Sequence, residues 1–308
     1  METIDGSDSQ WQPGFIGLGA QKSASAWLSH CLREHPEIYI DKKKEMHFFD
    51  TDANYRKGIQ YYKSLFSNKY NLLDGEITPA YFYEKEVAAR IHKHFPNVKL
   101  IVCLRNPADR AWSHYNYGVK VHARISVYSS FSEAFKSDRS LADNGRYGEQ
   151  LQRYLELFDE KQIKIIFHED IRNNPVETIK DVYRFIGVTN TNYTPIAANQ
   201  RVHNTQSIVL PLKHARTWGY LLKLRNYVHK YPKFESFLKT QGLITRIKTA
   251  VRTGTKAINE NSLQQTPNIM SDVERQLVID ELLTDINTLE KITGRNLRDW
   301  KSIASDRS

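Results

Sequence analysis

Short apolar runs alternate with amphipathic stretches from residue 14 to about residue 187. Five runs have the length and composition of buried parallel strands: Phe15–Leu18, Ile38–Ile40, Leu72–Gly75, Leu100–Leu104 and Ile163–Phe167. Apolar positions spaced by three and four predict five helices: Ser25–Glu34, Val87–His94, Asp109–Val121, Tyr147–Phe158 and Pro175–Ile186. Strands that alternate with helices favour an α/β fold, in which helices flank a central parallel sheet.

The pattern changes in the second part of the chain. Residues 208–256 are basic, aromatic and helical in character, and residues 254–268 are typical of a linker. A last helix is expected at about Ser271–Ile292, where Ser271 and Glu274 have the spacing of a capping box. We therefore expect a flexible N-terminus at 1–13 and a single domain at 14–308. Within it we expect an α/β core at 14–190, a basic helical acceptor or lid region at 208–256 and a C-terminal helical segment at 271–300.

The positive charge of the chain is concentrated in one segment. The 308 residues have a formal net charge of +9. Eleven Lys or Arg and one acidic residue, Glu235, lie between Lys213 and Lys256, so the remainder is close to neutral. Such a segment attracts a phosphorylated ligand, an acidic glycan, a nucleic acid or an anionic membrane, or it is simply a solvated surface.

Cysteine content and hydropathy bear on location. No apolar run approaches the roughly 18 to 20 residues that span a bilayer, and the first eight residues are acidic and polar. Two cysteines, Cys31 and Cys103, are too few for a disulfide framework or a zinc cluster. We expect no membrane anchor, no signal peptide and a cytoplasmic protein with reduced thiols.

A polar turn follows the first predicted strand and leads into a helix, which is the layout of a phosphate-binding turn. Residues 19–25 offer successive backbone N–H groups, the charge of Lys22 and the hydroxyls of Ser23 and Ser25. Lys22 is not preceded by glycine, whereas the P-loop of nucleoside triphosphatases ends in Gly-Lys-Ser/Thr. The alternative is an ordinary strand-to-helix turn with a surface lysine.

A second anion site is predicted after the strand at Leu100–Leu104. Arg105 follows this strand, and a helix that begins near Pro107 brings Ser113 round two turns later. The carboxyl ends of parallel strands meet at one edge of a sheet, so both sites are expected in one crevice. A kinase would more often carry an acidic residue here to hold magnesium. The alternative is that Arg105 only pairs locally.

Several stretches resemble the motifs of one enzyme family. Gln21–Leu28 is similar to the 5′-phosphosulfate loop of sulfotransferases, and Arg105–Tyr115 to their 3′-phosphate motif. Three further stretches are similar, in order and spacing, to the heparan sulfate N- and 3-O-sulfotransferases: Lys44–Asp50, Asn54–Gly58 and Glu76–Phe82. The resemblance covers about residues 14–190 and, more loosely, Gly294–Trp300, which resembles the ending of bacterial sulfotransferases.

The resemblance implies a three-layer, P-loop-like fold and the co-substrate 3′-phosphoadenosine 5′-phosphosulfate (PAPS), released as 3′-phosphoadenosine 5′-phosphate (PAP), without a metal. The co-substrate site that it implies comprises Gln21, Lys22, Ser23, Ala24, Ser25, Ala26, Trp27, Arg105, Ser113, Tyr147 and Arg201, with Asn204 near Arg201. The side chain of Trp27 is expected to pack the helix against the sheet rather than to stack on the base.

The resemblance also implies the catalytic roles. Lys22, helped by Ser25, is expected to contact the oxygen that bridges sulfur and phosphorus, where it stabilises the leaving group. Glu45 is expected to act as the general base, with His47 as the reserve candidate or as a residue that orients the acceptor.

The phosphosulfate loop departs from the family pattern, which usually has glycine and threonine at the positions of Ala24 and Ala26. Ala26 lacks a hydroxyl, and Ala24 adds a methyl group where the backbone approaches a phosphate. We expect altered affinity for the nucleotide rather than lost function.

The expected function is transfer of a sulfuryl group from PAPS to a hydroxyl or amine of a carbohydrate or small metabolite. The expected partners are the nucleotide and this acceptor, without a nucleic acid. Two alternatives remain: a nucleotide kinase of related architecture, and a non-catalytic module that binds polyanions through the basic segment.

Overall fold

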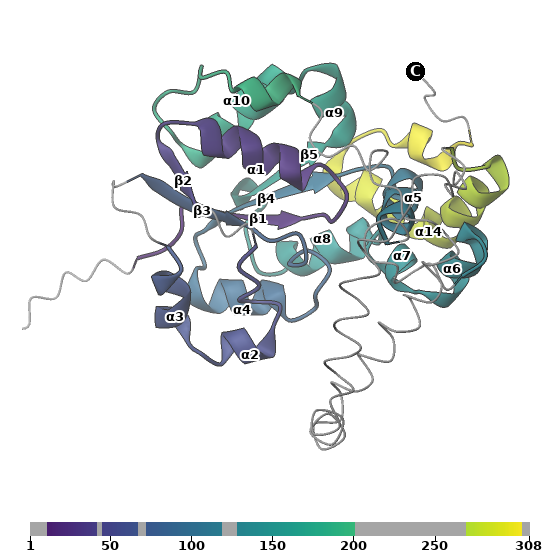
Figure 1. Ribbon diagram of the computed structural model, residues 1–308, viewed down its shortest axis with the longest axis horizontal. Helices are drawn as coiled ribbons and strands as arrows, with labels where there is room; N and C mark the ends of the chain where they lie inside the picture. Colours follow the sequence, from purple (N-terminus) through teal and green to yellow (C-terminus); the bar gives the residue numbers. More distant parts are fainter. Residues whose placement is uncertain (1–10, 42–44, 67–71, 119–127, 201–268, 304–308) are drawn as a thin grey trace, which may run out of the picture. The chain divides into compact units, whose positions relative to one another are not determined.

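The computed structural model describes residues 11–41, 45–66, 72–118, 128–200 and 269–303 (Figure 1). The chain divides into two compact units. The first comprises Met1–Arg110, Arg146–His203 and Leu282–Lys301, and the second comprises Ala111–Gly145, Asn204–Glu281 and Ser302–Ser308. The basic segment and the linker lie outside the described residues, so the expected arrangement of residues 14–308 as a single domain stays a prediction.

The first unit contains a five-stranded parallel sheet with the strand order β2-β3-β1-β4-β5. The strands are β1 Phe15–Gly19, β2 Ile38–Ile40, β3 Leu73–Ile77, β4 Lys99–Leu104 and β5 Ile163–Phe167. All five correspond to predicted strands, and β2 and β5 have the predicted bounds. Because the strands are parallel, the segments that follow them lie at one end of the sheet, called here the carboxyl edge.

Helices cover both faces of this sheet, which confirms the predicted α/β class (Figure 1). One face carries α1 Ser25–Glu34, α9 His168–Asn173 and α10 Pro175–Ile186. The other carries α2 Asp52–Tyr55, α3 Ile59–Ser64, α4 Val87–His94 and α8 Tyr147–Leu155. The predicted bounds of α1, α4 and α10 are confirmed, and α8 ends three residues earlier than predicted. Short 3₁₀ turns lie at Glu160–Gln162, Ile196–Asn199 and Arg298–Lys301.

Two helices have residues in both units. α5 spans Pro107–Tyr117 and begins two residues before the predicted start, at the proline that is favoured in a first helical turn. α14 spans Asp272–Thr293, and its predicted capping box is confirmed. The Ser271 N–H donates to Glu274 at 2.9 Å, and the Glu274 N–H donates to the Ser271 hydroxyl at 3.3 Å. The second unit also contains α6 Phe131–Ser137 and α7 Ser140–Asp143.

The core of the first unit has two parts, one on each face of the sheet. On one face, buried apolar side chains of α1 and α10, such as Leu28 and Val182, pack on β1 and β4. On the other face, an aromatic cluster surrounds Tyr62 and Phe49, whose ring centroids are 5.0 Å apart. Phe48 and Phe49 belong to this cluster, which anchors residues 45–49, including Glu45 and His47, to the first unit.

Candidate active site

The turn after β1 is tied closely to the neighbouring strands. Gly19 has a φ of 133°, and a Cβ there would lie 2.6 Å from the carbonyl oxygen of Pro79, so only glycine fits. The peptide bond between Gly19 and Ala20 is cis. The Ala20 N–H donates to the carbonyl of Cys103 on β4 at 2.7 Å. The turn is therefore held at the carboxyl edge of the sheet.

Backbone N–H groups of this turn and of the first turn of α1 form an anion-binding arrangement. Lys22 and Ala24 have φ values of 69° and 72°, in the left-handed region. The first intrahelical hydrogen bond runs from Leu28 N–H to Ala24 carbonyl, so the N–H groups of residues 25–27 precede it. Such N–H groups at a helix N-terminus bind phosphate. Ala24 thus adopts the left-handed conformation that glycine would favour, and the expected change in nucleotide affinity stays a prediction.

Two side chains of the turn point into the protein. The Trp27 indole is buried and donates to the carbonyl of Ala198 at 3.0 Å, which is the expected packing role. The hydroxyl of Ser23 is buried and lies 3.3 Å from the hydroxyl of Tyr147. In this arrangement Ser23 and Tyr147 brace the turn against α8, and their contact with the nucleotide stays a prediction.

Arg105 follows β4 and lies close to the same tyrosine. Burial raises the pKa of the Tyr147 hydroxyl. The charge of Arg105 and a hydrogen bond with the Arg105 backbone are among the effects that oppose this shift. The Arg105 Nε is buried and has no hydrogen-bond partner among the described residues. Arg110, in the first turns of α5, is completely buried. Burial lowers its pKa, Tyr147 opposes this shift and Arg105 adds to it. Two neighbouring guanidinium groups therefore give this region of the first unit a positive potential.

His168 follows β5 and lies within the positive potential of Arg105. Its pKa is lowered to about 4, first by burial and then by the charge of Arg105, against an opposing effect of Asp109. Sequence reasoning missed Arg110 and His168. Arg110 could have been found from its place in the Arg105–Tyr115 motif, whereas nothing in the pattern marks His168.

Glu45 and His47 form a chain of three side chains with Asp50. The Nε2 atom of His47 lies 3.2 Å from a Glu45 carboxylate oxygen, and its Nδ1 lies 2.7 Å from Asp50. Partial burial lowers the pKa of His47, but Asp50 and then Glu45 outweigh it and raise this pKa above its usual value. Asp50 was missed, although it stands three residues after His47 within the quoted Lys44–Asp50 motif.

Other predicted residues lie on α5, outside the described residues, or in the turn after β1. Ser113 lies on α5 in the second unit, so its position relative to Arg105 stays a prediction. Arg201 and Asn204 lie outside the described residues. Gln21 and Lys22 are half-buried in the turn.

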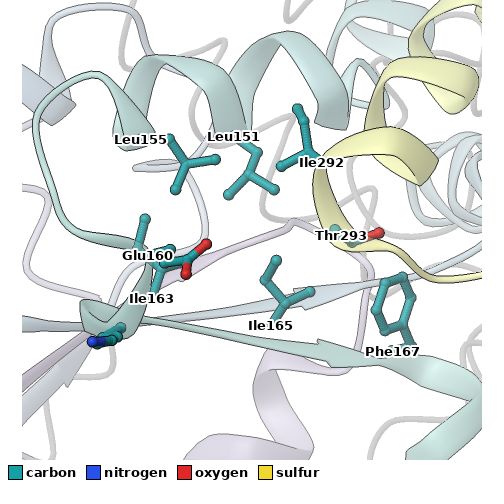
Figure 2. Close-up of a pocket in the computed structure, with 9 residues that line it drawn as sticks. Leu151, Leu155, Glu160, Ile163, Ile165, Phe167, Ile292 and Thr293 are labelled. Carbon is teal, nitrogen blue, oxygen red and sulfur yellow. The ribbon is translucent and has the colours of Figure 1, made fainter.

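A cavity of about 400 Å³, lined by apolar side chains and by Glu160, Lys161 and Thr293, lies elsewhere in the first unit (Figure 2). Side chains of α8, β5 and α14 face it, among them Leu151, Ile165 and Ile292. None of the predicted site residues lines it, so this cavity is separate from the residues described above. Within the described part of the chain, no group of three His, Cys, Asp or Glu side chains is placed to hold a metal ion. No helix among those described is long and apolar enough to cross a membrane.

Comparisons with known proteins identify the family. The model of the sulfotransferase domain matches residues 13–210, and the chain belongs to this family. Heparan sulfate glucosamine 3-O-sulfotransferase 5 of Mus musculus is 29% identical over 189 residues, which cover 58% of this chain and 54% of that protein. The bifunctional heparan sulfate N-deacetylase/N-sulfotransferase 2 of Homo sapiens is 30% identical over 202 residues, which cover 59% of this chain and 23% of that protein.

A solved structure supports the fold. The sulfotransferase from Alicyclobacillus acidocaldarius has a TM-score of 0.60 and 22% identity, and the match covers 95% of this chain and all of that one. The predicted family and the P-loop-like α/β fold are therefore confirmed. Members of the family use PAPS, so the expected co-substrate is confirmed at the level of the family. The chain matches about half the length of the first curated relative and a quarter of the second.

Proposed function

We propose that this chain transfers a sulfuryl group from PAPS to a hydroxyl, or an amine, of a carbohydrate or small metabolite. The observation that carries the proposal is that the Lys22 turn and Arg105 meet at Tyr147. Two separate cationic sites at one sheet edge suit a nucleotide with a 5′-phosphosulfate and a 3′-phosphate. The heparan sulfate relatives support a carbohydrate acceptor.

The two ends of the nucleotide are assigned to different groups. Lys22 and the N–H groups of residues 25–27 bind the 5′-phosphosulfate, because they combine a positive charge with a helix N-terminus. Arg105 binds the 3′-phosphate, since its buried Nε lacks a partner among the described residues and phosphate oxygens supply acceptors. Ser113 completes that second site in the proposal.

The transfer step needs a base and a stabilised leaving group. The acceptor oxygen or nitrogen attacks sulfur while the bond from sulfur to the bridging phosphate oxygen breaks, and PAP leaves. Glu45 takes the acceptor proton. Lys22 offsets the negative charge that develops on the leaving phosphate. His47, held by Asp50, orients the Glu45 carboxylate.

Nucleotide binding is the first test, by thermal unfolding with PAP and, separately, with ATP and magnesium. PAP is expected to raise the unfolding temperature, and Lys22→Ala is expected to weaken this effect. Lys161→Ala is the matched control, because Lys161 is exposed beside the opposite end of β5. Stabilisation by ATP with magnesium alone would instead indicate the kinase alternative.

Transfer itself is tested with sulfur-labelled PAPS and a panel of sugars, phenols, amines and hydroxylated metabolites. Glu45→Gln is expected to bind PAP and to lose transfer, whereas the exposed control Glu160→Gln keeps both. Steep salt dependence of polyanion binding without transfer to any acceptor would favour the binding-module alternative. The proposal includes a cytoplasmic location, supported only by two buried free cysteines and tested by cell fractionation.

A further inference from the structure

Glu76, at the end of β3, is a buried carboxylate surrounded by hydroxyl groups. Only 1% of its surface is exposed. Its Oε1 accepts hydrogen bonds from the hydroxyls of Tyr62 at 2.6 Å and Tyr81 at 3.2 Å, and its Oε2 accepts one from Thr78 at 2.9 Å. When this carboxyl is ionised it can only accept, and all three hydroxyl protons then point toward it.

Two of these hydroxyls also accept hydrogen bonds from the backbone of another segment. The Thr78 hydroxyl accepts from Met46 N–H at 3.1 Å. The Tyr81 hydroxyl accepts from Phe48 N–H at 3.1 Å and Phe49 N–H at 3.4 Å. A hydroxyl has one proton and two lone pairs, so a proton committed to Glu76 leaves the lone pairs for these N–H groups. Glu76 thereby fixes a chain of hydrogen bonds, called here the relay. It runs from the carboxylate through the Thr78 and Tyr81 hydroxyls to the backbone N–H groups of residues 46, 48 and 49.

The segment held by this relay carries the proposed base. Met46 lies between Glu45 and His47, and Phe48 follows directly. His47 has a φ of 48°, a left-handed conformation that is uncommon for a residue other than glycine. Its carbonyl oxygen accepts a hydrogen bond from the Asn54 side chain at 2.8 Å. A backbone in this region persists only where its surroundings hold it, and the relay supplies bonds on both sides of His47.

We propose that Glu76 is a positioning residue that, through Thr78 and Tyr81, sets the geometry of Glu45, His47 and Asp50. The carboxylate does not reach the reacting atoms, and its effect passes through backbone positions 46, 48 and 49. The consequence for turnover rests on the proposed sulfotransferase function. The consequence for the His47 environment does not, and it is measurable without any acceptor.

The test compares three single-hydroxyl deletions. Thr78→Val and Tyr81→Phe each remove one relay hydroxyl and keep the shape of the side chain. Tyr62→Phe is the matched control: its hydroxyl donates to the same Glu76 oxygen and is equally buried. In the described part of the chain, that hydroxyl takes no N–H from residues 46–49.

The principal readout is the pKa of His47, measured by NMR titration of labelled histidines and assigned with His47→Gln. Thr78→Val and Tyr81→Phe are expected to move it from its raised value toward about 6.5, because Asp50 and Glu45 lose their alignment. Tyr62→Phe is expected to leave it unchanged. Equal His47 pKa values in all three variants and the unmodified chain, or an equal shift in Tyr62→Phe, would overturn the proposal.

Turnover provides the second readout once an acceptor is known. The relay variants are expected to lower kcat by about tenfold or more while the affinity for PAP stays within twofold, because misplaced catalytic groups slow the chemical step. Retained PAP affinity also shows that a variant folds. If one of the two relay variants fails to fold, the other still decides the test. If no acceptor is ever found, the sulfotransferase proposal fails while the His47 titration still decides the role of Glu76.

Discussion

The imidazole of His47 faces the carboxylate of Glu45, with 3.2 Å between Nε2 and Oε2. The other ring nitrogen faces Asp50 at 2.7 Å, so a proton on each nitrogen gives both carboxylates a donor. This doubly protonated state is the one favoured by the raised pKa of His47. In this state the imidazolium donates to the Glu45 carboxylate and orients it.

This proton arrangement predicts the pH dependence of transfer. The rate is expected to fall in alkali, where His47 loses a proton above the ordinary histidine value of about 6.5. His47→Gln keeps an amide donor that does not titrate, so it should lose the alkaline limb of kcat against pH. A rate that instead rises through the histidine pKa would make His47 the base.

Replacing Ala24 by glycine is expected to stabilise the protein. Ala24 has a φ of 72° and a ψ of 17° just before α1, where an L-residue pays roughly 1–2 kcal/mol relative to glycine. The greater conformational entropy of glycine in the unfolded chain offsets part of this difference. The free energy of unfolding should therefore increase by up to about 1 kcal/mol. Urea unfolding of Ala24→Gly measures it. Ala26→Gly, inside the first helical turn, should change stability in the opposite direction.

How far the sequence could predict the structure depended on the length of each pattern. α1 and α10 have two or more turns of apolar spacing, and Pro175 and Gly187 mark the ends of α10, so the bounds of both helices could be predicted. The four-residue helices α2 and α7 are too short to show a period. α7 buries Leu141 and Ala142, whereas α2 buries no residue and pairs through Asp52 with Arg90 of α4.

The site divides in the same way. Lys22 and Arg105 could be predicted because each lies in a segment that follows a predicted strand. In a parallel sheet, such segments lie at the same edge. Glu76 could not be recognised from the pattern, because its burial depends on Tyr62 and Tyr81, which reach it from different segments. The burial of this carboxylate results from three-dimensional packing, and no sequence pattern distinguishes the tyrosine and threonine residues around it.

The burial of Glu76 predicts a pH-dependent stability. Desolvation raises the pKa of this carboxyl from its ordinary 4.5 to about 7, against the opposing hydrogen bonds of Tyr62, Thr78 and Tyr81. The folded state therefore keeps a proton that the unfolded state releases. The stability contributed by this group is full below about pH 4.5 and is lost as the pH rises to about 7. We expect the free energy of unfolding to fall by about 3 kcal/mol relative to Glu76→Gln across that window. A constant difference between the two proteins would contradict it.

Asp285 is expected to stabilise the helix that presents Tyr147. Its two carboxylate oxygens, on α14, accept the N–H groups of Gly148 and Glu149 at 2.9 Å each. These N–H groups belong to the first turn of α8, whose own N-cap residue, Arg146, makes no side-chain capping bond. Asp285 therefore caps α8 from a distant part of the chain.

Asp285→Ala removes both acceptors and leaves buried N–H groups unpaired, so we expect a loss of about 1–2 kcal/mol in the free energy of unfolding. Because α8 begins at Tyr147, loosening its first turn should also disturb the contact between Tyr147 and Ser23 and weaken PAP binding. Asp280→Ala is the matched control, since Asp280 is exposed on the same helix and should change stability by less than about 0.5 kcal/mol. Urea unfolding and calorimetric titration with PAP measure the two effects. A destabilised Asp285→Ala variant that binds PAP as tightly as the unmodified chain would show that α8 capping is independent of the nucleotide site.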